Sequence, residues 1–154
     1  MRKSVDSDLT SALLPAGLAL AGLCISVFFT LRTYGVVLPG APTPTGPNVC
    51  RRDGPSCETV VHTPAARLFA GIPNSVFGMA FYGLVLVSIA CGGWDRPGWL
   101  VPLLVAAALA VGAGVYLIVQ LYRVMRVSCP LCVVAHMINL LLAATFGVRL
   151  ALMV

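Results

Sequence analysis

The sequence predicts an all-α membrane protein: a four-transmembrane-helix bundle with one long, cysteine-bearing loop between the first and second helices. Its composition points to the bilayer, since 59% of the 154 residues are hydrophobic and only 10% are charged. Four apolar stretches contain no Asp, Glu, Lys or Arg, and each is long enough for the ~20 apolar residues that cross a ~30 Å hydrocarbon core. These stretches are residues 9–31, 68–94, 97–122 and 127–148.

The first apolar stretch is expected to stay in the protein as a helix. Arg2 and Lys3 would suit a signal peptide, but Asp6 and Asp8 follow at once, and the apolar run outlasts a normal signal-peptide core. We therefore expect a single integral membrane domain over residues 1–154, with transmembrane helices at 9–31, 74–94, 98–122 and 128–149 and a loop at 32–73.

The loop at residues 32–73 is the only long polar segment and carries Cys50 and Cys57. Residues 39–47, with the sequence PGAPTPTGP, are rich in Pro, Gly and Thr, a composition typical of a flexible and extended segment. This segment leads into Cys50, so we expect that cysteine on a mobile arm.

The third stretch carries small residues four apart, Ala108 with Gly112 and Ala110 with Gly114. This spacing is typical of membrane helices that approach each other closely, so it predicts helix packing rather than chemistry.

The fourth stretch opens with the pair Cys129-Pro-Leu-Cys132. A two-residue spacer keeps both sulfurs within bonding reach, as in proteins that exchange thiols and disulfides. We expect Cys129 in the first helical turn, with Ser128 as the N-cap, where the helix dipole favours a thiolate. Unrelated buried cysteines and a metal site are the alternatives for this pair.

His136 lies four residues after Cys132 and so on the same helix face. Ionisable side chains at membrane depth usually face the bundle interior or a cavity. His136 is therefore either a hydrogen-bond donor to a substrate or a partner in helix packing.

The number of crossings places both cysteine pairs at one membrane face. With four helices, the loop after the first helix and the start of the fourth lie on the same side, so Cys50 and Cys57 share a membrane face with Cys129 and Cys132. Disulfide exchange suits an oxidising compartment, which puts this face outside the cytoplasm. The count of basic residues opposes that orientation, because Lys and Arg normally gather on the cytoplasmic side. Six of them would lie outside: Arg32, Arg51, Arg52, Arg67, Arg123 and Arg126.

The formal net charge of +5 comes from ten basic and five acidic residues. No basic cluster with interleaved aromatic residues is present in the sequence, so no nucleic-acid partner is predicted.

Three features taken together resemble the vitamin K epoxide reductase family, in its bacterial, disulfide-generating branch. They are the loop with Cys50 and Cys57, the stretch GIPNSVFG at residues 71–78, and Cys129-Pro-Leu-Cys132. The resemblance spans nearly the whole chain. It implies a four-helix bundle around a quinone of the menaquinone, ubiquinone or phylloquinone type, and a thiol–disulfide oxidoreductase.

The resemblance also implies roles for individual residues. Cys50 would exchange with the protein partner, Cys57 would pass electrons to Cys129, and Cys132 would face the quinone. Asn74 would hydrogen-bond a quinone oxygen, although after Pro73 it is also a natural helix N-cap.

The chain departs from the family pattern at two candidate site residues. Thr63 stands six residues after the second loop cysteine, where relatives usually carry Ser, and it keeps the hydroxyl. His136 stands where many relatives have Tyr, which bears on the identity of the quinone. The chain ends at Val154 without a thioredoxin-like domain, so we expect a separate thioredoxin-like (DsbA-like) partner. We expect the protein in a bacterial inner membrane, with the ER membrane as the alternative.

Two other functions remain compatible with the sequence. A membrane carrier of soft metal ions could use the paired cysteines, since thiolates select such ions. The second alternative is a structural helix scaffold with one disulfide in the loop, which would leave Cys129-Pro-Leu-Cys132 without a role.

Overall fold

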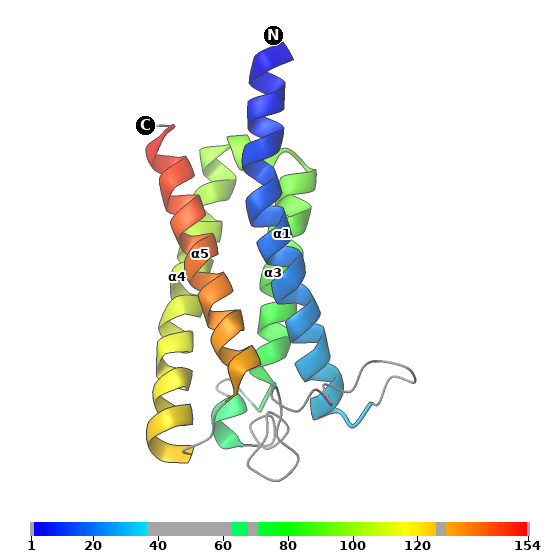
Figure 1. Cartoon of the computed structure of the whole chain (residues 1–154), viewed down its shortest axis with the longest axis vertical. Coiled ribbons are helices and arrows are strands. Elements are labelled where there is room, and N and C mark those ends of the chain that lie inside the picture. Colours follow the sequence, from blue (N-terminus) through cyan, green and yellow to red (C-terminus); the bar gives the residue numbers. More distant parts are fainter. Residues whose placement is uncertain (1, 37–62, 68–70, 126–128, 154) are drawn as a thin grey trace.

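The protein is described by a computed structural model that covers residues 2–36, 63–67, 71–125 and 129–153. The four long helices in these ranges are α1 (Arg2–Thr33), α3 (Asn74–Ala90), α4 (Pro97–Val119) and α5 (Pro130–Ala151). They run along one common direction, as Figure 1 shows. Short helices join them: η1 (Pro64–Ala66), η2 (Gly93–Asp95) and the π-helical η3 (Gln120–Met125).

Within the described ranges, three helical segments are long and apolar enough to cross a membrane, namely Ala12–Thr33, Pro97–Val124 and Pro130–Ala151. The fourth, α3, is a shorter apolar helix of 17 residues. Seventeen residues lie at the lower limit of the ~17–25 that span a bilayer. The prediction of an all-helical membrane protein is thus confirmed, with α3 shorter than expected.

The second helix was expected at residues 74–94 but ends at Ala90, although the uncharged stretch continues to Trp94. Gly92 adopts a left-handed backbone with φ 70°, which stops α3 at Ala90, and the chain then turns into η2. At the other end of the bundle, Gly35 has φ 72° and ends α1. There Val36 N donates to Leu31 O at 2.9 Å, which satisfies a carbonyl in the last turn.

The helices form two close pairs. α1 packs on α3, α4 packs on α5, and the pairs are joined mainly between α1 and α5, whereas α3 and α4 touch little. The α1–α3 approach is close at Gly22, where an added Cβ would lie 2.3 Å from the Tyr82 ring. Large side chains fill the shared core, including Val85, Leu100, Leu142 and Phe146. Many apolar side chains also point outward, as expected for a surface in lipid.

An ionic and aromatic cluster fastens η2 to the last turns of α5. Arg149 forms a salt bridge with Asp95, and its guanidinium lies 5.9 Å from the centre of the Trp94 ring. Trp94 in turn meets Phe146 edge to face, with ring centres 6.1 Å apart. This cluster lies at the end of the bundle that carries the C-terminus in Figure 1.

The opposite end of the bundle gathers the end of α1, the start of α3, the end of η3 and the start of α5 (Figure 1). Cys129 therefore shares an end with the points where the chain leaves α1 and enters α3. Cys50 and Cys57 lie outside the described residues.

Cys24 and Cys91 lie away from this end of the bundle. Their apolar neighbours in the sequence are typical of cysteines buried as small hydrophobic residues, yet both are exposed on the outside of the bundle. Hydropathy identifies a membrane helix but not which of its faces meets lipid.

Candidate active site

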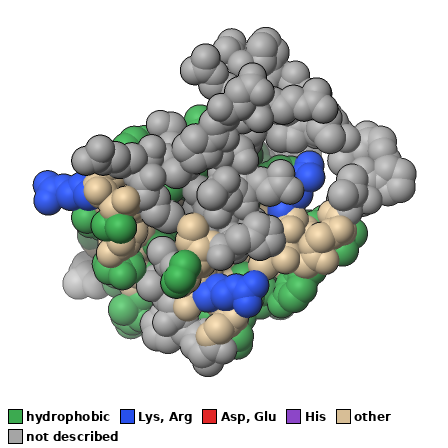
Figure 2. Space-filling view, turned by 90° about the horizontal axis from the view of Figure 1, so that it is seen from below, with side chains coloured by type: hydrophobic (Ala, Val, Ile, Leu, Met, Phe, Trp, Pro, Cys, Tyr) green, Lys and Arg blue, Asp and Glu red, His purple; other side chains and the backbone are tan. Residues whose placement is uncertain are grey.

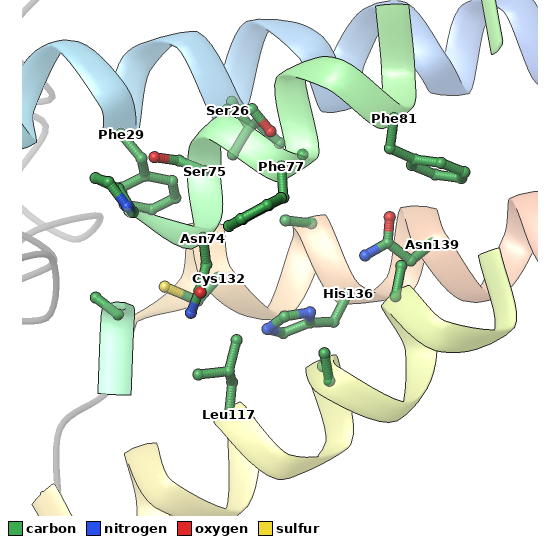
Figure 3. A pocket seen from close by; sticks show the side chains of 18 of the residues that line it. Ser26, Phe29, Asn74, Ser75, Phe77, Phe81, Leu117, Cys132, His136 and Asn139 are labelled. Carbon is green, nitrogen blue, oxygen red and sulfur yellow. The ribbon is translucent and has the colours of Figure 1, made fainter. Parts of the chain in front are cut away.

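A cavity of about 510 Å³ lies among the four long helices and η1. Its lining is mainly apolar, and Phe77, Phe81 and Leu117 are among the larger side chains (Figure 3). Four of the residues predicted for the site line it together: Thr63, Asn74, Cys132 and His136. Residues more than 70 positions apart in the chain, such as Thr63 and His136, thus meet at one cavity.

Cys132 opens onto this cavity, and Cys129 lies directly behind it. The two Sγ atoms are 2.6 Å apart, a little more than the ~2.05 Å length of a disulfide bond, and both cysteines are present as thiols. The pair can therefore close into a disulfide through small side-chain movements, which is the geometry that thiol–disulfide exchange requires.

Cys129 is completely buried, whereas Cys132 is partly accessible. Leu121 of η3 is buried beside Cys129, and Phe29 of α1 packs against the two of them. Within the pair, Cys132 is consequently the sulfur that can meet a ligand in the cavity.

The start of α5 differs from prediction by one residue. Cys129 is the N-cap, with φ −121° and ψ 94°, and does not lie in the first turn; Pro130 is the first helical residue. Pro is well suited to that position, because its fixed φ is helical and its missing N–H would have no partner there. The predicted N-cap, Ser128, lies outside the described residues.

His136 extends from α5 into the cavity, toward the side where Asn74 and Cys132 lie (Figure 3). Its Nδ1 is buried, has no hydrogen-bond partner among the described residues, and faces the backbone of Gly114 on α4. A neutral imidazole with its proton on Nε2 would leave Nδ1 as an acceptor and could donate a hydrogen bond from Nε2.

Asn74 is the first residue of α3, and the N-cap position is taken by Pro73. The alternative interpretation of Asn74 as an N-cap is therefore wrong, and its side chain instead lines the cavity. Thr63 precedes η1 as its N-cap without a side-chain capping bond, and it too lines the cavity. Both residues are thus placed where a ligand would be held.

Two polar residues of the cavity were missed in the sequence, Tyr82 and Asn139. The Tyr82 hydroxyl donates to Asn139 Oδ1 at 2.6 Å, and both side chains line the cavity. A signal for Asn139 was present, because Cys132, His136 and Asn139 follow the i, i+4, i+7 spacing of one helix face. Tyr82 carried no such signal, since it lies in an apolar run on another helix.

Ser26 and Ser75 also line the cavity. The hydroxyl of Thr30 on α1 donates to that of Ser75 on α3 at 2.9 Å, and within α1 it also donates to the Ser26 carbonyl at 2.8 Å. The bond to Ser75 helps to hold α1 against α3.

Among the described residues, the charged side chains seen at this end of the bundle are basic. Figure 2 views it from below, and basic side chains are visible there, with no acidic side chain of the described residues in sight. Arg32, Arg67 and Arg123 belong to the elements that gather at this end.

In a comparison with known protein families, the model of the vitamin K epoxide reductase family matches residues 13–146. The match covers α3 and α4 completely, most of α1 and α5, and every residue that lines the cavity. The chain belongs to the vitamin K epoxide reductase family. The resemblance seen in the sequence is thereby confirmed, and membership makes the chain a membrane oxidoreductase of the thiol–disulfide type. This family is in general linked to quinones and to thioredoxin-like partners. A search of curated proteins found no match.

Proposed function

We propose that this protein is a quinone-dependent thiol–disulfide oxidoreductase that reoxidises a separate thioredoxin-like partner. One observation carries the proposal: Cys132 opens onto an apolar cavity of about 510 Å³ while its Sγ touches that of Cys129. A dithiol that borders a lipid-compatible cavity is suited to pass electrons to a lipid-soluble acceptor.

The lining of the cavity fits a quinone ring. Its volume lies within the ~300–1,000 Å³ of small-molecule sites, and Phe77 and Phe81 offer aromatic faces for a flat ring. A quinone carbonyl needs a hydrogen-bond donor, and His136 and Asn74, which carry such groups, both line the cavity. A bound quinone would act as the two-electron acceptor.

The proposed electron path has three stages. A partner thiolate attacks the Cys50–Cys57 disulfide at Cys50, and the second thiol of the partner resolves the mixed disulfide, which leaves Cys50 and Cys57 reduced. Cys57 then attacks a Cys129–Cys132 disulfide at Cys129, which releases Cys132, and Cys50 attacks Cys57 of the Cys57–Cys129 disulfide, which restores Cys50–Cys57 and releases Cys129. In the last step, two electrons and two protons pass from the Cys129–Cys132 dithiol to the quinone, leaving a disulfide and a hydroquinone. Net flow toward the quinone depends on the reduction potentials, with ~30 mV equivalent to ~1.4 kcal/mol.

The test is quinone-dependent oxidation of dithiothreitol by the purified full-length protein with a panel of quinones. Cys129→Ser and Cys132→Ser should each abolish it, because each removes one sulfur of the disulfide that must form. Cys24→Ser and Cys91→Ser are matched controls, since both cysteines lie outside the cavity, and they should keep wild-type rates. Near-normal turnover in Cys132→Ser would contradict the proposal.

The soft-metal carrier makes a different prediction in the same material. Within the described ranges no group of three or more potential His, Cys, Asp or Glu ligands is present. If the protein were a carrier, reduced protein would bind Cu(I) or Zn²⁺ stoichiometrically and its thiols would not be oxidised by any quinone.

We further propose that the cysteine-bearing end faces outward from a bacterial inner membrane. The oxidising environment needed for disulfide exchange supports this orientation, and the basic residues at that end oppose it. A membrane-impermeant maleimide, added to intact cells after reduction, should label Cys50 and Cys57. Labelling only in inside-out vesicles would reverse the orientation.

A further inference from the structure

The hydrogen-bonded pair Tyr82 and Asn139 forms a second polar point on the wall of the cavity. Tyr82 Oη donates to Asn139 Oδ1 at 2.6 Å, and the backbone carbonyl of Ala135 lies 3.4 Å from the same hydroxyl. Because the carboxamide oxygen already accepts this bond, the orientation of the amide group is set by Tyr82. Tyr82 itself is held in place, since its ring is buried against Gly22 of α1.

The other half of the amide group, its NH₂, has no hydrogen-bond partner among the described residues. Figure 3 shows the Asn139 side chain projecting from α5 into the cavity, farther from Cys132 than His136 is. An amide donor in an apolar cavity loses free energy unless a ligand accepts its hydrogen bond. The position therefore calls for an acceptor atom in the ligand.

The spacing along α5 matches the dimension of a 1,4-quinone. His136 and Asn139 are three residues apart, which corresponds to a rise of about 4.5 Å along the helix. The two oxygens of a 1,4-quinone lie about 5 Å apart across the ring, since each C=O bond adds about 1.2 Å to its width. One carbonyl can thus meet His136 near Cys132 while the other meets Asn139.

We propose that the amide nitrogen of Asn139 binds the second carbonyl oxygen of a 1,4-quinone and that Tyr82 is the positioning residue for this contact. This inference rests on the proposed quinone reductase function and adds a determinant of specificity. A ring with carbonyl groups at both ends is held at two points, and a compound with one carbonyl is held at one.

The experiment compares binding of 1,4-naphthoquinone with that of 1-tetralone, a relative with one carbonyl group. Dissociation constants are measured on the oxidised full-length protein without reductant. All variants carry Cys24→Ser and Cys91→Ser, so that no free thiol at these two exposed positions adds to the quinone. Asn139→Leu keeps a side chain of similar size, and it leaves the Tyr82 hydroxyl with the Ala135 carbonyl as an acceptor. Wild type should prefer the quinone, and the variant should lose about three- to tenfold of that preference, the factor that one hydrogen bond represents.

The same preference for the quinone over 1-tetralone is measured in three further variants. Tyr82→Phe frees the amide to rotate, so it should reduce the preference by a smaller factor than Asn139→Leu. His136→Phe removes the contact at the other end and should also reduce the preference, whereas Gly112→Ala, on α4 with open space around it, should leave it unchanged. An equal loss of affinity for both ligands in Asn139→Leu would assign Asn139 to packing alone and overturn the inference.

The role of Asn139 and the proposed quinone reductase function are tested independently of each other. If wild type oxidises dithiothreitol with quinones and Asn139→Leu keeps the wild-type preference, only the role of Asn139 is wrong. If Cys132→Ser still reduces quinones, the reductase mechanism fails whatever Asn139 does.

Discussion

Gly114 of α4 lies directly against the imidazole ring of His136 on α5. A Cβ added at Gly114 would be 2.5 Å from Nδ1 and 3.0 Å from Cγ of that ring, closer than real side chains pack. The absence of a side chain at residue 114 therefore makes the space that His136 occupies. It also lets the two helices approach closely, as the small-residue spacing in the third stretch predicts.

Gly114→Ala should displace His136 from its present position. Because the clash is with a ring and not with the end of a flexible chain, we expect the variant to raise the KM for quinone severalfold and to lower stability by ~1–3 kcal/mol. Gly112→Ala is the matched control, since it adds the same methyl group on the same helix with nothing within 4 Å. Steady-state kinetics and thermal unfolding in detergent measure both effects; identical behaviour of the two variants would contradict the prediction.

His136→Phe should keep the helices packed and both cysteines reactive, yet weaken quinone binding. The lost hydrogen bond is worth ~0.5–1.5 kcal/mol, which corresponds to a severalfold rise in KM. His136→Tyr should be tolerated better, because the phenol restores a donor. The measurement is the KM for several quinones with dithiothreitol held constant. Unchanged kinetics in His136→Phe would make His136 a packing residue.

Phe29→Ala should expose Cys129. Phe29 packs against the buried pair Leu121 and Cys129, so removing its ring opens a path to the sulfur. In reduced wild-type protein, we expect a maleimide to label Cys132 much faster than Cys129, and the variant should narrow that difference. Phe28→Ala is the control, since its ring lies next to Phe29 but is absent from the cluster around Cys129. Mass spectrometry of the labelled peptides measures the labelling rate of each sulfur. Equal labelling rates for Cys129 and Cys132 in wild type would contradict the burial of Cys129.

Cys50→Ala should impair oxidation of a protein partner more than oxidation of a small dithiol. A small dithiol can reach the Cys129–Cys132 pair through the cavity, where Cys132 is accessible, whereas a folded protein is too large to enter. The variant should also accumulate a Cys57–Cys129 disulfide, because Cys57 has lost its partner in the loop. Peptide mapping under non-reducing conditions detects this bond, with Cys24→Ala as the control. A relay in the proposed order is excluded if the bond never forms.

Much of the candidate site could be predicted from the chain because its residues lie at regular spacings. Cys132 and His136 share a helix face by the i, i+4 rule, and four crossings bring the start of the fourth helix to the end where the first helix stops. The roles of Asn74 and Thr63 rested on family resemblance, and the structure places both at the cavity. The Tyr82–Asn139 bond was not predictable, because it joins two helices whose rotation about their axes depends on packing.

Hydropathy and the order of the cysteines in the chain determined by themselves that the protein is a membrane bundle and that the pair Cys129 and Cys132 opens the last helix. This was possible because bilayer thickness imposes a length on every spanning segment. Only the tertiary structure decided that α3 stops at Ala90, that Cys129 is buried while Cys132 meets the cavity, and that Gly114 accommodates His136. Those features depend on which faces of α1, α3, α4 and α5 turn toward one another, and uniformly apolar helices carry little pattern that specifies it.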